Sequence, residues 1–205
     1  HRDLHSFPTR RSSDLKLSTS VWANEEELGP PDYVIEIPST DVPATGVVDY
    51  KYQYVKNSVG KDIWVKASEI VPGDRQVLHH VITSFGPTET RGPRKGKLKF
   101  RERKGLRGYA PGINSNPFPD NSGTFLPANA TFEFQMHYTP VGRATVDSTK
   151  MGIWVADEKP KHEIFSMIML NPRIRIPAGV KEHKESVSRA VSEDSEEHTS
   201  ELQSQ

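Results

Sequence analysis

The chain has no cysteine among its 205 residues. This absence excludes disulfide bonds, and it excludes the metal centres that need a thiolate: thiolate zinc sites, iron–sulfur clusters and blue-copper centres. A covalently attached c-type haem is excluded as well. The redox compartment cannot be inferred from cysteine usage. Any metal ion must therefore be held by imidazole, carboxylate or thioether groups.

Long apolar segments are also missing. No apolar run approaches the roughly 18 residues needed to span a bilayer, so we expect no membrane-spanning segment. The start of the chain lacks a basic region followed by an apolar one, so no signal peptide is expected. Hydrophobic residues make up 34% of the chain. That fraction suffices for a core but is low for a compact domain, which indicates that part of the length does not fold.

The two ends of the chain are polar and aperiodic. Residues 1–15 and 195–205 also resemble translated adapter sequence from a DNA-sequencing library. We therefore interpret the chain as a gene fragment with disordered ends, whose native part is about residues 16–194. On this interpretation His1, His5 and His198 are not ligand candidates.

Between these ends, short apolar runs alternate with turn signals about every ten residues, and no amphipathic helical stripe is visible. This pattern predicts an all-β fold, an antiparallel β-sandwich that forms a single domain. The predicted strands are residues 33–38, 47–56, 63–67, 77–85, 131–140, 151–156 and 164–170, with 174–179 closing the pattern. We expect a polar linker at 16–32, the sandwich at 33–180 and a charged tail at 181–194.

Residues 86–108 carry nine basic side chains opposed by Glu89 and Glu102. A nucleic-acid site would need stacking aromatics or a reading helix beside such a charge run. Phe100 is the only aromatic residue there, and no helix is predicted. We therefore interpret the stretch as a solvated loop or hairpin, and we expect no nucleic-acid partner.

Candidate metal ligands lie in two of the predicted strands. In the strand at 131–140, Phe132, Phe134 and Met136 share one face with Tyr138. Because side chains alternate along a strand, His137 must lie on the opposite, outer face. That face suits a ligand, but it also suits an ordinary surface histidine.

The adjacent pair His79-His80 lies in an apolar strand. Neighbouring side chains of an ideal strand point to opposite faces, so both can serve one metal only where the strand twists, ends or bulges. Burying two imidazoles costs stability unless their nitrogens find partners, and a metal ion supplies such partners. Three neutral imidazoles suit copper, zinc, iron or nickel, so ligand type alone does not choose the metal.

The double histidine is followed some 57 residues later by Gln135-Met136-His137-Tyr138. This arrangement resembles the copper type II, ascorbate-dependent monooxygenases, the family of peptidylglycine α-hydroxylating monooxygenase and dopamine β-monooxygenase. The resemblance covers about residues 40–180 and includes the ending Ile176-Pro177-Ala178-Gly179. Residues 108–112 and 136–140 look most like the bacterial branch.

The resemblance implies a jelly-roll β-sandwich of the family's N-terminal type. It also implies that His79, His80 and His137 hold one copper ion that passes electrons. In the family a second domain holds another copper through a His-x-His pair and a methionine, and this chain contains no His-x-His. The implied partners are therefore the missing C-terminal copper domain and a small-molecule reductant such as ascorbate. The parent protein would hydroxylate a C–H bond, the fragment alone would not, and a periplasmic or extracellular location is favoured.

Two other classes of function stay open at this stage. One is a three-histidine zinc hydrolase, or another metal hydrolase, in which Glu133 or Glu163 would serve as base. The other is a non-catalytic β-sandwich that acts as a binding module. The latter predicts that the three imidazoles lie far apart, well beyond about 5 Å.

Overall fold

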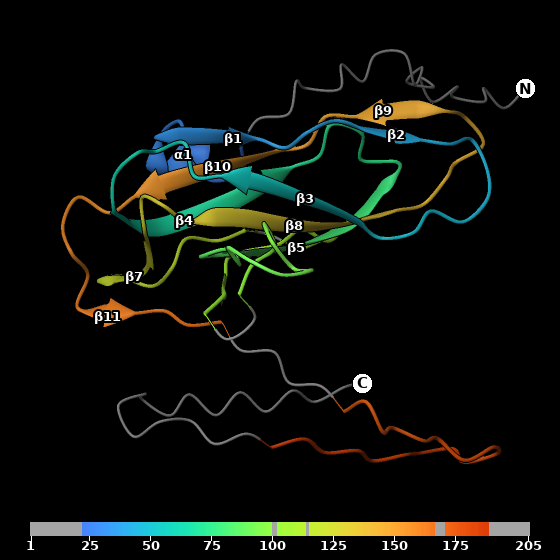
Figure 1. Ribbon diagram of the computed structural model, residues 1–205. Coiled ribbons are helices and arrows are strands. Elements are labelled where there is room, and N and C mark those ends of the chain that lie inside the picture. The colour runs from blue at the N-terminus through green and yellow to red at the C-terminus, as the bar shows by residue number, and fades with distance from the viewer. Residues whose placement is uncertain (1–21, 100–101, 114, 167–170, 189–205) are drawn as a thin grey trace, which may run out of the picture. The chain divides into compact units, whose positions relative to one another are not determined.

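A computed structural model describes residues 22–99, 102–113, 115–166 and 171–188 (Figure 1). The adapter-like ends, residues 1–15 and 195–205, lie outside these ranges. The described elements are a short helix and eleven strands: α1 (Glu25–Leu28), β1 (Tyr33–Glu36), β2 (Thr40–Val42), β3 (Lys51–Lys56), β4 (Ile63–Val71), β5 (Leu78–Gly86), β6 (Lys104–Gly105), β7 (Ser122–Leu126), β8 (Thr131–Tyr138), β9 (Thr145–Asp147), β10 (Lys150–Val155) and β11 (His162–Glu163).

Most of the strands belong to two sheets that share one core (Figure 1). The five-stranded sheet has the order β1-β10-β4-β7-β11, and the four-stranded sheet has the order β3-β8-β5-β6. All pairs are antiparallel except β11 with β7, and β2 and β9 form a separate antiparallel pair. Side chains from both sheets, such as Met151 and Phe132, belong to a single buried cluster. The prediction of an all-β, antiparallel sandwich is thus confirmed.

Strand β8 follows the predicted alternation. Phe132, Phe134, Met136 and Tyr138 are at most 2% exposed and belong to the core. His137 lies between the last two of these positions and is half-buried on the outer face. The hydrophobic side chains of β8 thus determine the register that presents His137 outward.

Strand β3 has its tyrosine face on the outside of the sandwich. Tyr52 is 50% exposed, whereas Val55, on the other face, packs against the core. Tyr52 pairs with Gln135 across the β3–β8 ladder, and the Gln135 amide donates a hydrogen bond to the Tyr52 hydroxyl. Because Tyr52 pairs with Gln135, which shares the outer face of β8 with His137, the tyrosine side chains of β3 continue that outer face.

The prediction of a linker at residues 16–32 is wrong for the part that the structure describes. Trp22 is buried and packs edge-to-face on Trp154, with ring centroids 6.0 Å apart. The Glu69 carboxylate accepts hydrogen bonds from the backbone N–H groups of Ala23 and Asn24. The segment is docked on the sandwich by one tryptophan and by one buried carboxylate. Because these are isolated contacts, no periodic pattern in the sequence indicates that the segment is folded.

The sandwich also ends earlier than the predicted residue 180. The last strand is β11, and Ile164 to Ser166 do not extend it. Residues 167–170 of the predicted strand lie outside the described residues, and the strand expected at 174–179 is not formed. The compact unit ends at Ser166, and the described residues 171–188 belong to a separate unit.

Residues 88–98 of the basic stretch form a hairpin with an exposed tip, in line with the predicted solvated loop or hairpin, whereas Lys104–Gly105 form β6 and Leu106 is buried. Thr88 and Leu98 make an isolated antiparallel bridge, and Glu89 exchanges backbone hydrogen bonds with Lys97 and Gly96. The basic side chains at its tip, Arg91, Arg94 and Lys95, are exposed. Among the described residues no helix is long and apolar enough to cross a membrane.

Replacing Gly108 by alanine is expected to destabilise the fold by about 2 kcal/mol or more, because the new methyl group would overlap a backbone oxygen that cannot move aside. A Cβ at this position would meet the carbonyl oxygen of Val81, in the middle of β5. Urea unfolding followed by circular dichroism measures the change. Gly142→Ala offers a contrast, since a Cβ there has no neighbour within 4 Å but meets a positive φ of 85°. A loss at Gly108 no larger than at Gly142 would contradict the close approach.

Candidate metal centre

The two adjacent histidines lie at a β-bulge. Leu78 pairs with Tyr138 and His80 with His137, so two steps along β5 face one step along β8. His79 is the extra residue. A bulge of this kind bends the strand and redirects a side chain, which is the local feature that the sequence requires if both histidines are to face His137.

The three imidazoles converge at this bulge. The Nδ1 atom of His80 lies 3.0 Å from Nδ1 of His79 and 3.3 Å from Nδ1 of His137. One ligand nitrogen from each ring can be chosen so that all three lie within 4.8 Å of one another. Within the described residues, this is the one group of three or more histidine, aspartate or glutamate side chains close enough to hold a metal ion.

The donor set fits a first-row transition metal. Imidazole nitrogens bind such ions at about 2.0 Å, so nitrogens that share one ion lie roughly 2.8–4 Å apart. The separations of 3.0 and 3.3 Å fall in that range. No carboxylate belongs to the group, so the site would carry no negative charge of its own. Which metal it holds does not follow from these distances.

The centre lies at the surface of the four-stranded sheet. His79 is exposed, whereas His80 and His137 are half-buried. The ring of Tyr50 lies against His137, with centroids 4.8 Å apart, and 6.0 Å from His80. Burial and the neighbouring rings of His137 and His79 lower the pKa of His80. This shift favours the neutral imidazole, which is the form that binds a metal.

A buried carboxylate connects the segments that carry the histidines. Asp147 accepts hydrogen bonds from the Tyr138 hydroxyl (2.9 Å) and from the backbone N–H of Asp74 (2.8 Å). Tyr138 directly follows His137. The backbone carbonyl of Asp74 accepts the N–H groups of Val77 and Leu78 at the turn before β5. Asp147 therefore ties the end of β8 to the start of β5, next to the bulge.

Asp74 itself is held by charged and neutral donors. Its Oδ2 accepts hydrogen bonds from Arg143 (2.6 Å) and Thr145 (3.1 Å), and its Oδ1 accepts the backbone N–H of Gln76. Burial opposes ionisation of this carboxyl, but these hydrogen bonds outweigh burial and lower the pKa of Asp74. The turn that leads into the bulge is thus stabilised by the ionised form.

Because the pKa of Asp74 is lowered on folding, its contribution to stability is present above the ordinary value of 3.8 and is lost as the pH falls through the lower, folded value. Asp74→Asn is expected to unfold about 1 kcal/mol more easily at pH 7, since it loses charge-assisted hydrogen bonds. The difference should disappear as the pH falls well below 3.8. Urea unfolding of both proteins from pH 7 down to about pH 2 measures it, and a difference that does not depend on pH would contradict this account.

The carboxylates considered as a hydrolytic base lie elsewhere. Glu133 is four residues before His137 on β8, about 13 Å along the strand, and pairs with Arg103. Glu163 lies on β11, in the other sheet, and pairs with Lys104 at 2.5 Å. Neither is placed to activate a water molecule at the three imidazoles.

The other histidines that the structure describes do not belong to the three-histidine group. His162 is exposed on β11, and His183 pairs with Glu185 in the separate unit. Met136 and Met151 are buried in the core.

The sequence did not predict that Tyr50 neighbours the centre. Tyr50, Tyr52 and Tyr54 alternate with other residues, and this alternation was the one pattern that could have indicated it. Val71-Pro72-Gly73-Asp74 is a turn signal that leads into the double-histidine strand, but the sequence pattern indicates neither the hydrogen bonds of the Asp74 carboxylate nor Asp147.

Comparisons with known proteins identify no family for the chain. A scan against protein-family models found no match, and a search of curated proteins found none. Any proposal about the function of the chain therefore depends on the fold, the three-histidine group and the sequence motifs.

Proposed function

We propose that the chain is part of a copper-dependent monooxygenase and carries its three-histidine, electron-transfer copper site. The observation that supports this most is the convergence of His79, His80 and His137 at the bulge, with no carboxylate in the group. The order and spacing of these histidines also resemble those of the copper type II, ascorbate-dependent monooxygenases. The oxygen-activating domain, with its own copper, would lie outside this chain.

The donor set suits electron transfer better than hydrolysis. When bound, copper would supply a one-electron redox couple. Three neutral imidazoles can hold either oxidation state without gaining or losing a charged ligand. The sheet positions His80 and His137 on paired strands, and the Tyr50 ring packs against His137. Both features keep the ligands in place, which lowers the reorganisation that an electron transfer requires.

The exposure of the centre is consistent with exchange of electrons with other molecules. His79 is exposed, so a small reductant or a partner domain can approach its ring. A partner in the periplasm or outside the cell fits the resemblance. We expect the chain alone to bind copper and to be reducible, but not to hydroxylate a substrate.

A copper titration of the full chain tests the proposal. We expect one Cu(II) per chain, an electron paramagnetic resonance signal with nitrogen hyperfine structure, loss of the signal with ascorbate and its return in air. The same titration with Zn(II) serves as a comparison. Tight zinc binding together with a copper signal that ascorbate does not remove would overturn the electron-transfer proposal.

A further inference from the structure

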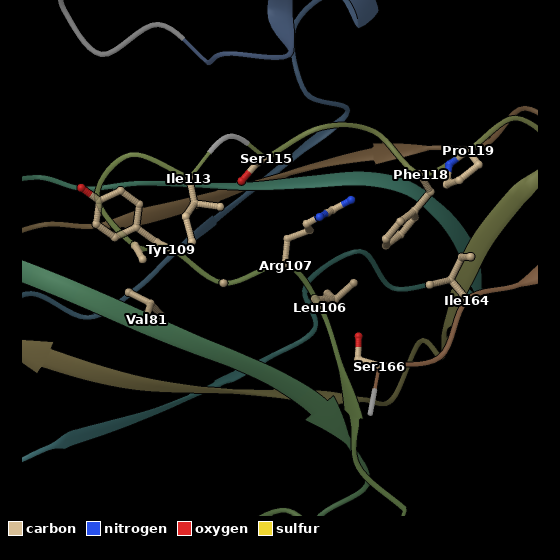
Figure 2. Close-up of a pocket in the computed structure, with 12 residues that line it drawn as sticks. Val81, Leu106, Arg107, Tyr109, Ile113, Ser115, Phe118, Pro119, Ile164 and Ser166 are labelled. Atoms are coloured by element: carbon tan, nitrogen blue, oxygen red, sulfur yellow. The ribbon is translucent and has the colours of Figure 1, made fainter. Parts of the chain in front are cut away.

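The second site of interest is a cleft of about 570 Å³ along the edge of β5 that faces away from β8 (Figure 2). Val81, next to His80, contributes a buried side chain to its wall. The segment after β6 forms much of the rest, since Tyr109 is joined to Val81 by two backbone hydrogen bonds of 2.9 Å. The lining residues are Val81, Leu106, Arg107, Gly108, Tyr109, Ala110, Ile113, Ser115, Phe118, Pro119, Ile164 and Ser166. This volume is in the range of small-molecule sites.

Among the described residues that line the cleft, Arg107 is the only charged one. Its Nε atom is buried and has no hydrogen-bond partner. Among the described residues, no carboxylate pairs with its guanidinium group, which lies over the Phe118 ring at 5.6 Å from the ring centroid. Figure 2 shows the Arg107 side chain among the lining residues, with its guanidinium group near Phe118.

Arg107 is half-buried, and its Nε–H is the donor that has lost water without gaining an acceptor. Leaving a buried donor unsatisfied is costly, and most buried polar groups in proteins are hydrogen-bonded. Here the protein supplies walls and a cation, but no acidic group, so an anionic ligand would complete the site. The Phe118 ring, with its centroid 5.6 Å from the guanidinium carbon, adds a cation–π contact on one side of the group.

We propose that this cleft binds an organic carboxylate with an apolar body. A carboxylate matches the planar guanidinium fork and accepts two parallel hydrogen bonds, which a single Arg can satisfy. The apolar part would lie against Ile113, Phe118 and Ile164. Ser115 and Ser166 add hydroxyl groups at the wall. A multiply charged anion such as phosphate fits less well, because Arg107 is the one cation among the described lining residues.

The test uses 3-phenylpropanoate and its neutral analogue 3-phenylpropanamide with the full chain. Isothermal titration is expected to show binding of the carboxylate that is at least about tenfold tighter than that of the amide, since a charge-assisted pair replaces a neutral one. Methyl-labelled protein should show shifts of the Ile113 and Ile164 methyl resonances, whereas Ile35, in the core of the sandwich, should not shift.

Arg107→Met is expected to abolish the preference for the carboxylate, and Arg107→Lys should keep part of it. Arg91→Met, at the tip of the exposed basic hairpin, removes the same charge elsewhere and should bind as the unaltered protein does. Absence of carboxylate binding would overturn the proposal. So would equal binding of acid and amide, or a preference that survives in Arg107→Met. If Arg107→Met fails to fold, the comparison of acid with amide and the methyl shifts in the unaltered protein decide the question.

Discussion

Copper affinity is expected to fall at least about 100-fold when His137 is replaced by alanine, while the fold stays intact. Three imidazoles share one group, and the loss of one donor removes a metal–nitrogen bond that nothing nearby replaces, since no carboxylate belongs to the group. His137 is half-buried on the outer face of β8 and does not belong to the core cluster. Its removal should therefore change the free energy of unfolding by no more than about 0.5 kcal/mol.

His162→Ala provides the matched control for this measurement. His162 is exposed and lies on β11 in the five-stranded sheet, away from the centre. Competition with a chromogenic chelator gives the copper affinity of each protein, and circular dichroism checks the fold. Equal losses in His137→Ala and His162→Ala would mean that copper binds non-specifically to surface histidines. An unchanged affinity in His137→Ala would remove this residue from the site.

The positions of the histidines could be predicted from sequence because two separate patterns constrain them. The alternation of Phe132, Phe134 and Met136 determines which face of β8 lies in the core, and His137 follows from it. The pair His79-His80 requires a local irregularity if both rings serve one ion, and the register shift between Leu78 and His80 supplies it. The alternation in β8 leaves only one arrangement of its polar side chains, whereas β5 is apolar on both faces, so its sequence indicates that an irregularity is needed but not which one.

Features that depend on single long-range contacts could not be predicted in the same way. Trp22 packs on Trp154, and Glu69 accepts backbone N–H groups across 46 and 45 positions of sequence. Such single contacts leave no periodic pattern in the sequence, so the polar segment that contains Trp22 was predicted to be a linker. The opposite error occurred at residues 174–179, where a β-like run of residues lacks a neighbouring strand. Propensity without a pairing partner does not make a strand.

Loss of the Asp147 carboxylate is expected to cost about 3 kcal/mol in the free energy of unfolding. Asp147 is 1% exposed and accepts hydrogen bonds from Tyr138, from Thr149 (2.6 Å) and from the backbone N–H of Asp74. Asp147→Ala would leave three buried or partly buried donors without an acceptor, at about 1–3 kcal/mol for each unsatisfied group. Removing a buried charge recovers some desolvation energy, which offsets part of this loss.

Tyr138→Phe measures the contribution of the Tyr138 hydrogen bond separately from that of the rest of the Asp147 carboxylate. This variant removes one donor and leaves the Asp147 carboxylate with its other two partners, so we expect a loss of only about 1 kcal/mol. Burial, and then the negative charge of Asp147, raise the pKa of Tyr138, so its hydroxyl remains a donor at neutral pH. Urea unfolding at pH 7 measures both variants. An Asp147→Ala protein with the same free energy of unfolding as Tyr138→Phe would contradict this account. It would mean that the cost of burying the carboxylate cancels the stabilisation from its other hydrogen bonds, including the one to the turn before β5.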